Sequence, residues 1–125
     1  MMLLLDTQMV IWAAGDLPQL PTEARRHIAR ARAIYVSAVS LWEIGMKVSS
    51  GKLKLPMGEL EARLAAAHAL PLMLTWTHAL RAHDIAPYHR DPFDRLLLAQ
   101  AVTEPLHFLT TDESLARYSS LVIAV

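Results

Sequence analysis

The sequence predicts an α/β protein, a three-layer α/β/α sandwich around a mainly parallel central sheet. Short apolar runs alternate with longer segments of helical periodicity, and glycine or proline stands at many of the breaks. There is also no internal repeat and no linker long enough to divide the chain. Its 125 residues, 54% of them hydrophobic, are enough for one substantial core. We therefore expect residues 1–125 to form a single domain.

The first strand is predicted at residues 2–5, where the continuous apolar run MLLL is typical of a strand buried on both faces. The later strands are predicted from further short apolar runs bounded by turn residues. They cover residues 33–37, 70–75, 106–110 and 121–124.

Helices are predicted between these strands, and several carry recognisable end signals. Gly51 is placed to end the helix over residues 38–50, because glycine readily takes the left-handed conformation found after a helix. Asp91 and Pro92 form a favourable helix start, and the helix over residues 91–104 is apolar on most of its surface, so it should be largely buried. The other predicted helices cover residues 7–14, 22–32, 58–69, 76–84 and 113–118.

Composition excludes several classes of function. The absence of cysteine removes disulfides, thiolate zinc sites and cysteine nucleophiles. No apolar run reaches the roughly 18 residues that span a bilayer, and the start MMLLLDTQ lacks the basic region of a signal peptide, so a cytoplasmic protein without membrane association is expected. Twelve Lys and Arg balance twelve Asp and Glu, which argues against broad coating of nucleic acid. The high apolar content favours a protein partner or a homodimer.

Two aspartates lie just after the ends of predicted strands. Asp6 comes after the first strand, and Asp112 comes shortly after the strand over residues 106–110. Because the carboxyl ends of parallel strands share one edge of the sheet, where ligands bind, these side chains can meet there. Each can instead merely cap the helix that follows it.

Two further acids stand in apolar surroundings. Glu43 lies in a helix with little polar surface, although an exposed pair with Lys47 one turn later is an alternative explanation. Asp94 shares a helix face with Leu97 and Leu98, and it is not needed as a cap because Asp91 already serves. Buried carboxylates that converge repel one another unless protons or a cation neutralise them.

A hard divalent cation suits such a set of oxygen ligands. Mg²⁺ or Mn²⁺ is expected rather than zinc, because the acids come without cysteine and the histidines lack the spacing of a helical zinc pair. The chain also lacks a glycine-rich phosphate loop and the nucleophile motif of serine hydrolases.

The segments LLLDT, VSAVSLWEIGMKVSSGKLKLP, HRDPFDRLLLAQA and LTTDESLARY, in this order, resemble the PIN-domain ribonucleases, specifically toxins of the VapC type. The resemblance covers the chain from Leu3 to the last strand, and the combination of SLWEI, GKL and HRDPFDR is its most specific part. It implies an α/β/α fold with an acidic Mg²⁺ or Mn²⁺ site at the strand ends. The family's site acids map onto Asp6, Glu43, Asp94 and Asp112.

Neighbouring polar residues receive supporting roles from the same resemblance. Asp91 fits the helix start or an outer position around the metal. Hydroxyl groups beside the acids are expected to orient carboxylates or waters. These hydroxyls belong to Thr7, Ser37 and Thr111.

The resemblance implies a Mg²⁺-dependent endoribonuclease that acts as the toxin of a toxin–antitoxin pair, with a cognate antitoxin and a homodimeric state. Basic residues near the acids are candidates for phosphate contacts, although each can equally be a solvated charge or an ion-pair partner. They are Lys47, Lys52, Lys54, Arg90 and Arg95. Tryptophans can stack on bases, but for Trp42 we expect core packing.

Two other classes of function are alternatives to this interpretation. A phosphatase with Asp6 as nucleophile needs a second acid two residues later, where this chain has Gln8. A non-catalytic interaction module that retains the PIN fold is the main alternative, and the presence of all four acids argues against it. The sequence does not identify the RNA target, the antitoxin or the number of metal ions.

Overall fold

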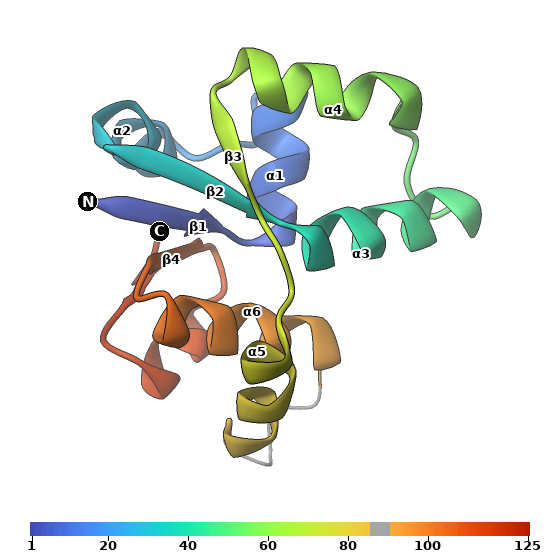
Figure 1. Cartoon of the computed structure of the whole chain (residues 1–125). Coiled ribbons are helices and arrows are strands. Elements are labelled where there is room, and N and C mark those ends of the chain that lie inside the picture. The colour runs from blue at the N-terminus through green and yellow to red at the C-terminus, as the bar shows by residue number, and fades with distance from the viewer. Residues whose placement is uncertain (86–90) are drawn as a thin grey trace.

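Five parallel strands form the central sheet of the computed structural model, which describes residues 1–85 and 91–125 (Figure 1). Every neighbouring pair is parallel, and the strand order is β3-β2-β1-β4-β5. The predicted parallel sheet is confirmed, and all carboxyl ends of its strands therefore lie along one edge. The strands are β1 (Met2–Leu5), β2 (Ala33–Ser37), β3 (Ala69–Leu72), β4 (His107–Thr110) and β5 (Val122–Ala124).

Helices cover both faces of this sheet, which confirms the predicted α/β/α sandwich. In Figure 1, α1, α2 and α4 lie above the sheet, α5 and α6 lie below it, and α3 extends beyond the end of β2. None of the helices in residues 1–85 and 91–125 has the length and apolar character needed to cross a membrane. The α-helices are α1 (Thr7–Ala14), α2 (Thr22–Arg30), α3 (Ala38–Ser49), α4 (Met57–Ala66), α5 (Trp76–Arg81) and α6 (Pro92–Thr103). Two 3₁₀ helices are η1 (Ala82–Asp84) and η2 (Glu113–Tyr118).

The central strand β1 contributes to a hydrophobic core on each side of the sheet. Leu3 and Leu5 pack in one cluster with residues of α1, α2 and α4, whereas Leu4 packs in the other with residues of α6. Successive side chains of a strand point to opposite faces, so the run MLLL supplies both cores at once. Burial on both faces explains why this strand is uniformly apolar.

Element boundaries differ from the predictions at a few ends. Strand β3 stops at Leu72 rather than at residue 75, because its partner β2 ends at Ser37, opposite Leu72. Thr75 accepts a hydrogen bond from the backbone of His78 and so caps α5. The helix expected over residues 76–84 is divided into α5 and η1. The end of α3 agrees with its end signal, since Gly51 follows it with φ of 78°.

The expectation that Trp42 packs in the core is wrong, because 69% of this residue is exposed. The buried side of α3 includes Val39, Ser40 and Ile44. Trp42 lies two residues before Ile44, and two helical residues are about 200° apart around the axis. The apolar Trp42 and Met46 therefore lie on the outer surface of α3.

Candidate active site

Asp6 and Asp112 lie at the carboxyl edge of two hydrogen-bonded strands. Strands β1 and β4 pair in parallel with Leu5 opposite Leu109, and the backbone N–H of Asp6 donates to the Leu109 carbonyl at 3.0 Å. This register places Asp6 beside Thr110, two residues before Asp112. The sheet thus brings together two acids that are more than 100 residues apart in the sequence.

The carboxylate of Asp6 is held by two hydrogen bonds. Its Oδ1 accepts from the backbone N–H of Thr7 at 2.7 Å, and its Oδ2 accepts from the Thr110 hydroxyl at 2.6 Å. Burial raises the pKa of Asp6, and repulsion by Glu43 and Asp112 raises it further, while the two hydrogen bonds oppose the shift. Asp6 therefore feels the negative charges of two of the other predicted site acids.

Glu43 reaches the same region from α3. Its Oε1 accepts a hydrogen bond from the Thr7 hydroxyl at 2.7 Å, and its Oε2 lies 3.3 Å from Nζ of Lys47. Only 13% of the Glu43 side chain is exposed. The Thr7 hydroxyl also lies 3.0 Å from the hydroxyl of Ser40, one turn before Glu43 on α3. Thr7 therefore connects Asp6, through its backbone, with Glu43, through its side chain.

The other aspartates of the candidate site lie at helix starts. Asp112 caps η2, since its Oδ1 accepts from the backbone N–H of Ser114 at 3.0 Å and from its hydroxyl at 2.6 Å. Asp91 caps α6 through hydrogen bonds from the N–H groups of Phe93 and Asp94. Asp94 is partly buried in the first turn of α6, a helix that packs against α3.

These acids present the oxygen ligands that a hard cation prefers, and their mutual repulsion is what a cation relieves. Within residues 1–85 and 91–125, however, no three acidic or histidine side chains form a group that can hold a metal ion as they lie. Oxygens of Asp6 and Glu43 instead accept hydrogen bonds from threonines, and Glu43 also pairs with Lys47. The residue types fit Mg²⁺ or Mn²⁺, while ligation requires these side chains to change partners.

The hydroxyl groups expected near the site have different positions. Thr7 contacts Glu43, as described above, whereas Ser37 caps α3 and donates to Gln100. Thr110 is the threonine that donates to Asp6, and it was missed in favour of the adjacent Thr111. Strand register alone distinguishes these two threonines, and a single sequence does not display register.

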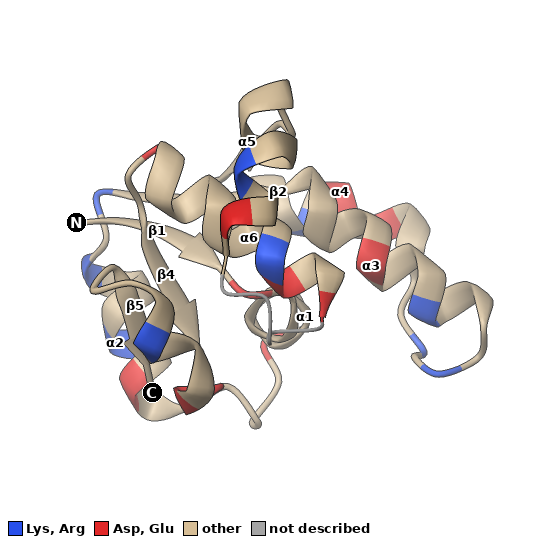
Figure 2. Cartoon of the chain, turned by 90° about the horizontal axis from the view of Figure 1, so that it is seen from below, with Lys and Arg blue, Asp and Glu red and all other residues tan. Residues whose placement is uncertain are grey.

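An open groove of about 620 Å³ lies beside Glu43, between the second half of α3 and the start of α6. Figure 2 shows acidic and basic residues on both helices, and basic residues continue into the loop after α3. The groove is lined by Glu43, Met46, Lys47, Ser50, Lys52, Asp91, Pro92 and Phe93.

The other basic candidates lie elsewhere. Lys54 is exposed in the loop after α3. The guanidinium of Arg95 donates to the carbonyl oxygen of Ala82 through Nε at 3.2 Å and Nη2 at 3.0 Å, which ties α6 to η1. Arg90 lies outside the described residues.

A parallel α/β/α sandwich with acids gathered at the carboxyl edge of its sheet is an arrangement suited to hydrolytic chemistry. The family model of the PIN domain matches residues 3–121, and the chain belongs to this family. PIN domains are generally nucleases that use divalent metal ions. By sequence, no curated protein matches the chain.

Solved structures with the same fold come from bacterial complexes. The chain is similar to one in VapBC2 from Rickettsia felis bound to promoter DNA, with a TM-score of 0.71 and 13% identity over 100% of this chain and 98% of the other. A toxin–antitoxin complex from Klebsiella pneumoniae gives a TM-score of 0.69 and 18% identity, covering 97% and 95%. FitAcB from Neisseria gonorrhoeae gives 0.66 and 20%, covering 98% and 96%. At these identities, the likeness establishes the fold.

Proposed function

We propose that this chain is a metal-dependent endoribonuclease and the toxin of a toxin–antitoxin pair. The single observation that carries the proposal is the environment of Asp6. Its carboxylate is partly buried at the carboxyl edge of the sheet, and it feels the charges of Glu43 and Asp112. A structural aspartate gains nothing from like charges nearby, whereas a metal ligand needs them.

Asp6, Glu43, Asp94 and Asp112 would hold the metal in this proposal. When bound, Mg²⁺ or Mn²⁺ would supply an activated water and neutralise charge that develops on a phosphodiester. Thr7 and Thr110 orient the carboxylates of Glu43 and Asp6 through their hydroxyls. Lys47 pairs with the second oxygen of Glu43, so it balances the charge of this carboxylate until a metal takes its place.

The groove beside Glu43 suits the RNA backbone. Lys47 and Lys52 line it together with apolar side chains that include Met46 and Phe93. Ammonium groups contact phosphates without reading the base sequence, and an aromatic ring accepts a stacked base. The basic residues thus offset the repulsion between an acidic site and a polyanion.

Partners are part of the proposal. One solved relative is a toxin–antitoxin complex, which supports a cognate antitoxin. A homodimer is supported by the exposed apolar side chains along the segment from Met73 to Leu80, where Trp76 is 90% exposed and Leu80 is 71% exposed. Light scattering of the parent and of a Trp76→Ser, Leu80→Ser double variant tests this, and a monomeric parent contradicts it.

The activity is tested by incubating purified protein with total cellular RNA, with Mg²⁺ or with EDTA. Asp94→Asn removes one charge from the site and should lower the cleavage rate at least a hundredfold. Asp16→Asn is the matched control, because it makes the same chemical change at an exposed position with φ of 46°, which asparagine tolerates. Cleavage that persists in EDTA or in Asp94→Asn contradicts the proposal.

Expression tests the toxin role separately from the chemistry. The chain produced alone should arrest growth, and production together with the antitoxin from its neighbouring reading frame should restore growth. If neither condition changes growth while RNA is cleaved in vitro, the toxin role fails and the nuclease activity stands. If the chain neither cleaves RNA nor arrests growth, the alternative of a non-catalytic interaction module is favoured.

A further inference from the structure

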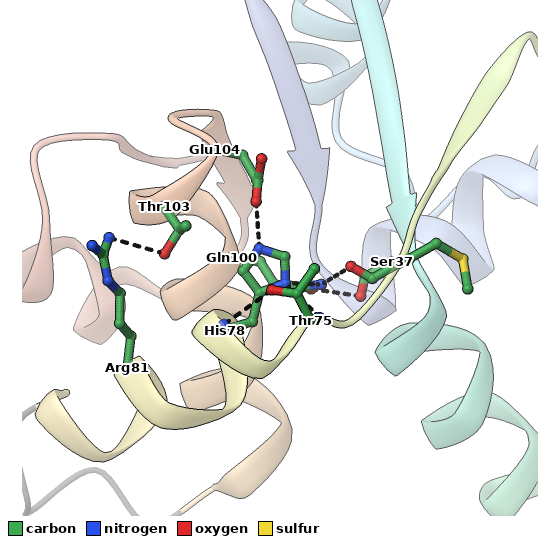
Figure 3. A network of polar contacts seen from close by, with 8 residues as sticks. Ser37, Thr75, His78, Arg81, Gln100, Thr103 and Glu104 are labelled. Carbon is green, nitrogen blue, oxygen red and sulfur yellow. Dashed lines mark hydrogen bonds and ion pairs between the residues drawn. The ribbon is translucent and has the colours of Figure 1, made fainter.

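A buried network of polar side chains joins α6 to the start of α3 and to α5, outside the acidic site (Figure 3). Gln100 of α6 stands at its centre, and both Gln100 and His78 are fully buried. The network extends from Ser37, the N-cap of α3, through Gln100 and His78 to Glu104. A buried polar group without a hydrogen-bond partner lowers the stability of the fold, so breaking any one contact of this network is unfavourable.

The donors and acceptors of Gln100 are assigned by its partners. Its Nε2 lies 3.3 Å from the carbonyl oxygen of Met73, which only accepts, so the amide nitrogen must face Met73. Its Oε1 then accepts from the Ser37 hydroxyl at 2.5 Å, while that hydroxyl accepts from the N–H of Val39 at 3.0 Å. This orientation of the amide satisfies both of its contacts, to Met73 and to Ser37.

His78 is assigned in the same way. The backbone N–H of Thr75 only donates, and it lies 3.1 Å from Nδ1, so Nδ1 accepts and the proton of the neutral ring is on Nε2. Nε2 then donates to the carboxylate of Glu104. The amide nitrogen of Gln100 also points at Nδ1, at 3.3 Å. Turning the Gln100 amide over would therefore place its oxygen against the Met73 carbonyl and Nδ1 of His78, which both accept, and lose both contacts.

This arrangement connects the two helices that carry site acids. Ser37 begins α3, which holds Glu43, and Gln100 belongs to α6, which holds Asp94 in its first turn. Ser40, one turn before Glu43, lies beside Thr7 and so beside the end of β1. Gln100 is thus a direct hydrogen-bonded link between the start of α3 and the body of α6.

We propose that Gln100 is a positioning residue of the acidic site: by holding Ser37 it sets where α3 starts relative to α6, and so the separation of Glu43 and Asp94. The inference rests on the proposed function, because it assigns Gln100 a role toward the metal ligands. A residue that only stabilised the fold would affect metal binding no more than any other core residue.

The positioning role of Gln100 is tested without RNA by measuring Mn²⁺ binding to the whole protein. The loss of the electron paramagnetic resonance signal of free Mn²⁺ reports the binding. Gln100→Met keeps the length of the side chain but removes every hydrogen bond. We expect its dissociation constant for Mn²⁺ to rise about tenfold or more, the usual effect of losing support behind a metal ligand. Leu60→Ala in α4 is the control, because it weakens the core on the other face of the sheet. It should bind within about twofold of the parent.

Gln100→Glu provides a second readout that also serves if the methionine variant does not fold. The introduced carboxyl accepts from Ser37 in either protonation state, but it donates to the Met73 carbonyl only while protonated. The dissociation constant of this variant, divided by that of the parent at the same pH, should therefore rise with pH. A ratio that stays near one at every pH overturns the proposal.

The outcomes separate this inference from the proposed function. If the parent binds no Mn²⁺, the metal site fails and the positioning role fails with it. If the parent binds Mn²⁺ and Gln100→Met binds equally well, only the positioning role is overturned. Equal weakening in Gln100→Met and Leu60→Ala also overturns it, because the effect is then a general loosening of the fold.

Discussion

Replacing Thr110 by valine tests how the site holds Asp6, one of its partly buried acids. Thr110 is fully buried, and its hydroxyl donates to Oδ2 of Asp6 at 2.6 Å. The same hydroxyl accepts from the backbone N–H of Asp112 at 3.0 Å. Valine has nearly the same shape, so the substitution removes two hydrogen bonds without opening a cavity.

The expected cost follows from these contacts. A hydrogen bond to a charged group contributes about 1.5–3 kcal/mol, and the N–H of Asp112 adds about 1 kcal/mol because water partly replaces its lost acceptor. The added methyl group of valine returns about 0.8 kcal/mol. Thr110→Val should therefore lower the free energy of unfolding by about 2–3 kcal/mol at neutral pH.

The dependence on pH identifies the cause. The Thr110 hydroxyl stabilises the charged form of Asp6, whose pKa is nevertheless raised by burial. This contribution exists only while Asp6 is ionised, so the cost of Thr110→Val should shrink as pH falls below the pKa of Asp6. Urea denaturation at neutral and acid pH measures it.

Thr111→Val is the matched control for this experiment. Thr111 is partly exposed beside the buried Thr110, and its substitution should change the free energy of unfolding by less than about 0.5 kcal/mol. Equal costs for the two variants, or a cost for Thr110→Val that does not change with pH, would refute the reasoning.

Three further predictions concern charge and backbone conformation. Asp6→Asn without metal should be more stable than the parent at neutral pH and should lose this advantage in acid. Because the pKa of Asp6 is raised in the folded state, the contribution of Asp6 to the stability of the parent is complete below the unfolded pKa of about 3.9 and declines as pH rises through the folded pKa. Denaturation in EDTA across this range checks it, and a less stable Asn variant at neutral pH contradicts it. Lys47→Met should tighten Mn²⁺ binding about threefold, because Lys47 neutralises Glu43, and it should weaken RNA binding at low salt. Titrations with Mn²⁺ and with RNA measure the two affinities. If both affinities change in the same direction, Lys47 does not both neutralise Glu43 and contact RNA. Gly51→Ala should cost about 1 kcal/mol because φ is 78°, whereas Gly58→Ala in the first turn of α4 should gain about 0.5 kcal/mol. An added Cβ meets nothing within 4 Å at either position. Thermal denaturation compares the two variants, and effects of the same sign would refute the backbone argument.

Much of the fold was predictable because its signals are local. The alternation of strands and helices follows from apolar runs and helical periodicity, and Gly51 and Asp91 mark helix ends through their own backbone and side-chain preferences. Less predictable was the end of β3, because its last paired residue, Leu72, is set by the end of the partner strand β2, while the apolar run continues through Met73 and Leu74.

The candidate site was likewise predictable only in part. Asp6 and Asp112 could be placed at one sheet edge, because parallel strands with apolar sequences must align their carboxyl ends. The sequence could not decide whether the hydroxyl that donates to Asp6 belongs to Thr110 or to Thr111, because a shift of one residue in strand register turns each side chain to the other face of the sheet. Trp42 was predicted wrongly because α3 has apolar residues on more than one face, so its sequence does not identify the buried one.

By itself, the sequence determined the order of the elements, the parallel sheet and the acids available to a cation, since these depend on residue type and on patterns within short segments. The tertiary structure alone decided that Thr7 and Thr110 hold the carboxylates of Glu43 and Asp6, and that Gln100 contacts both Ser37 and His78. Those contacts join residues from separate elements, and the register and packing angles that create them arise only when the whole chain is folded.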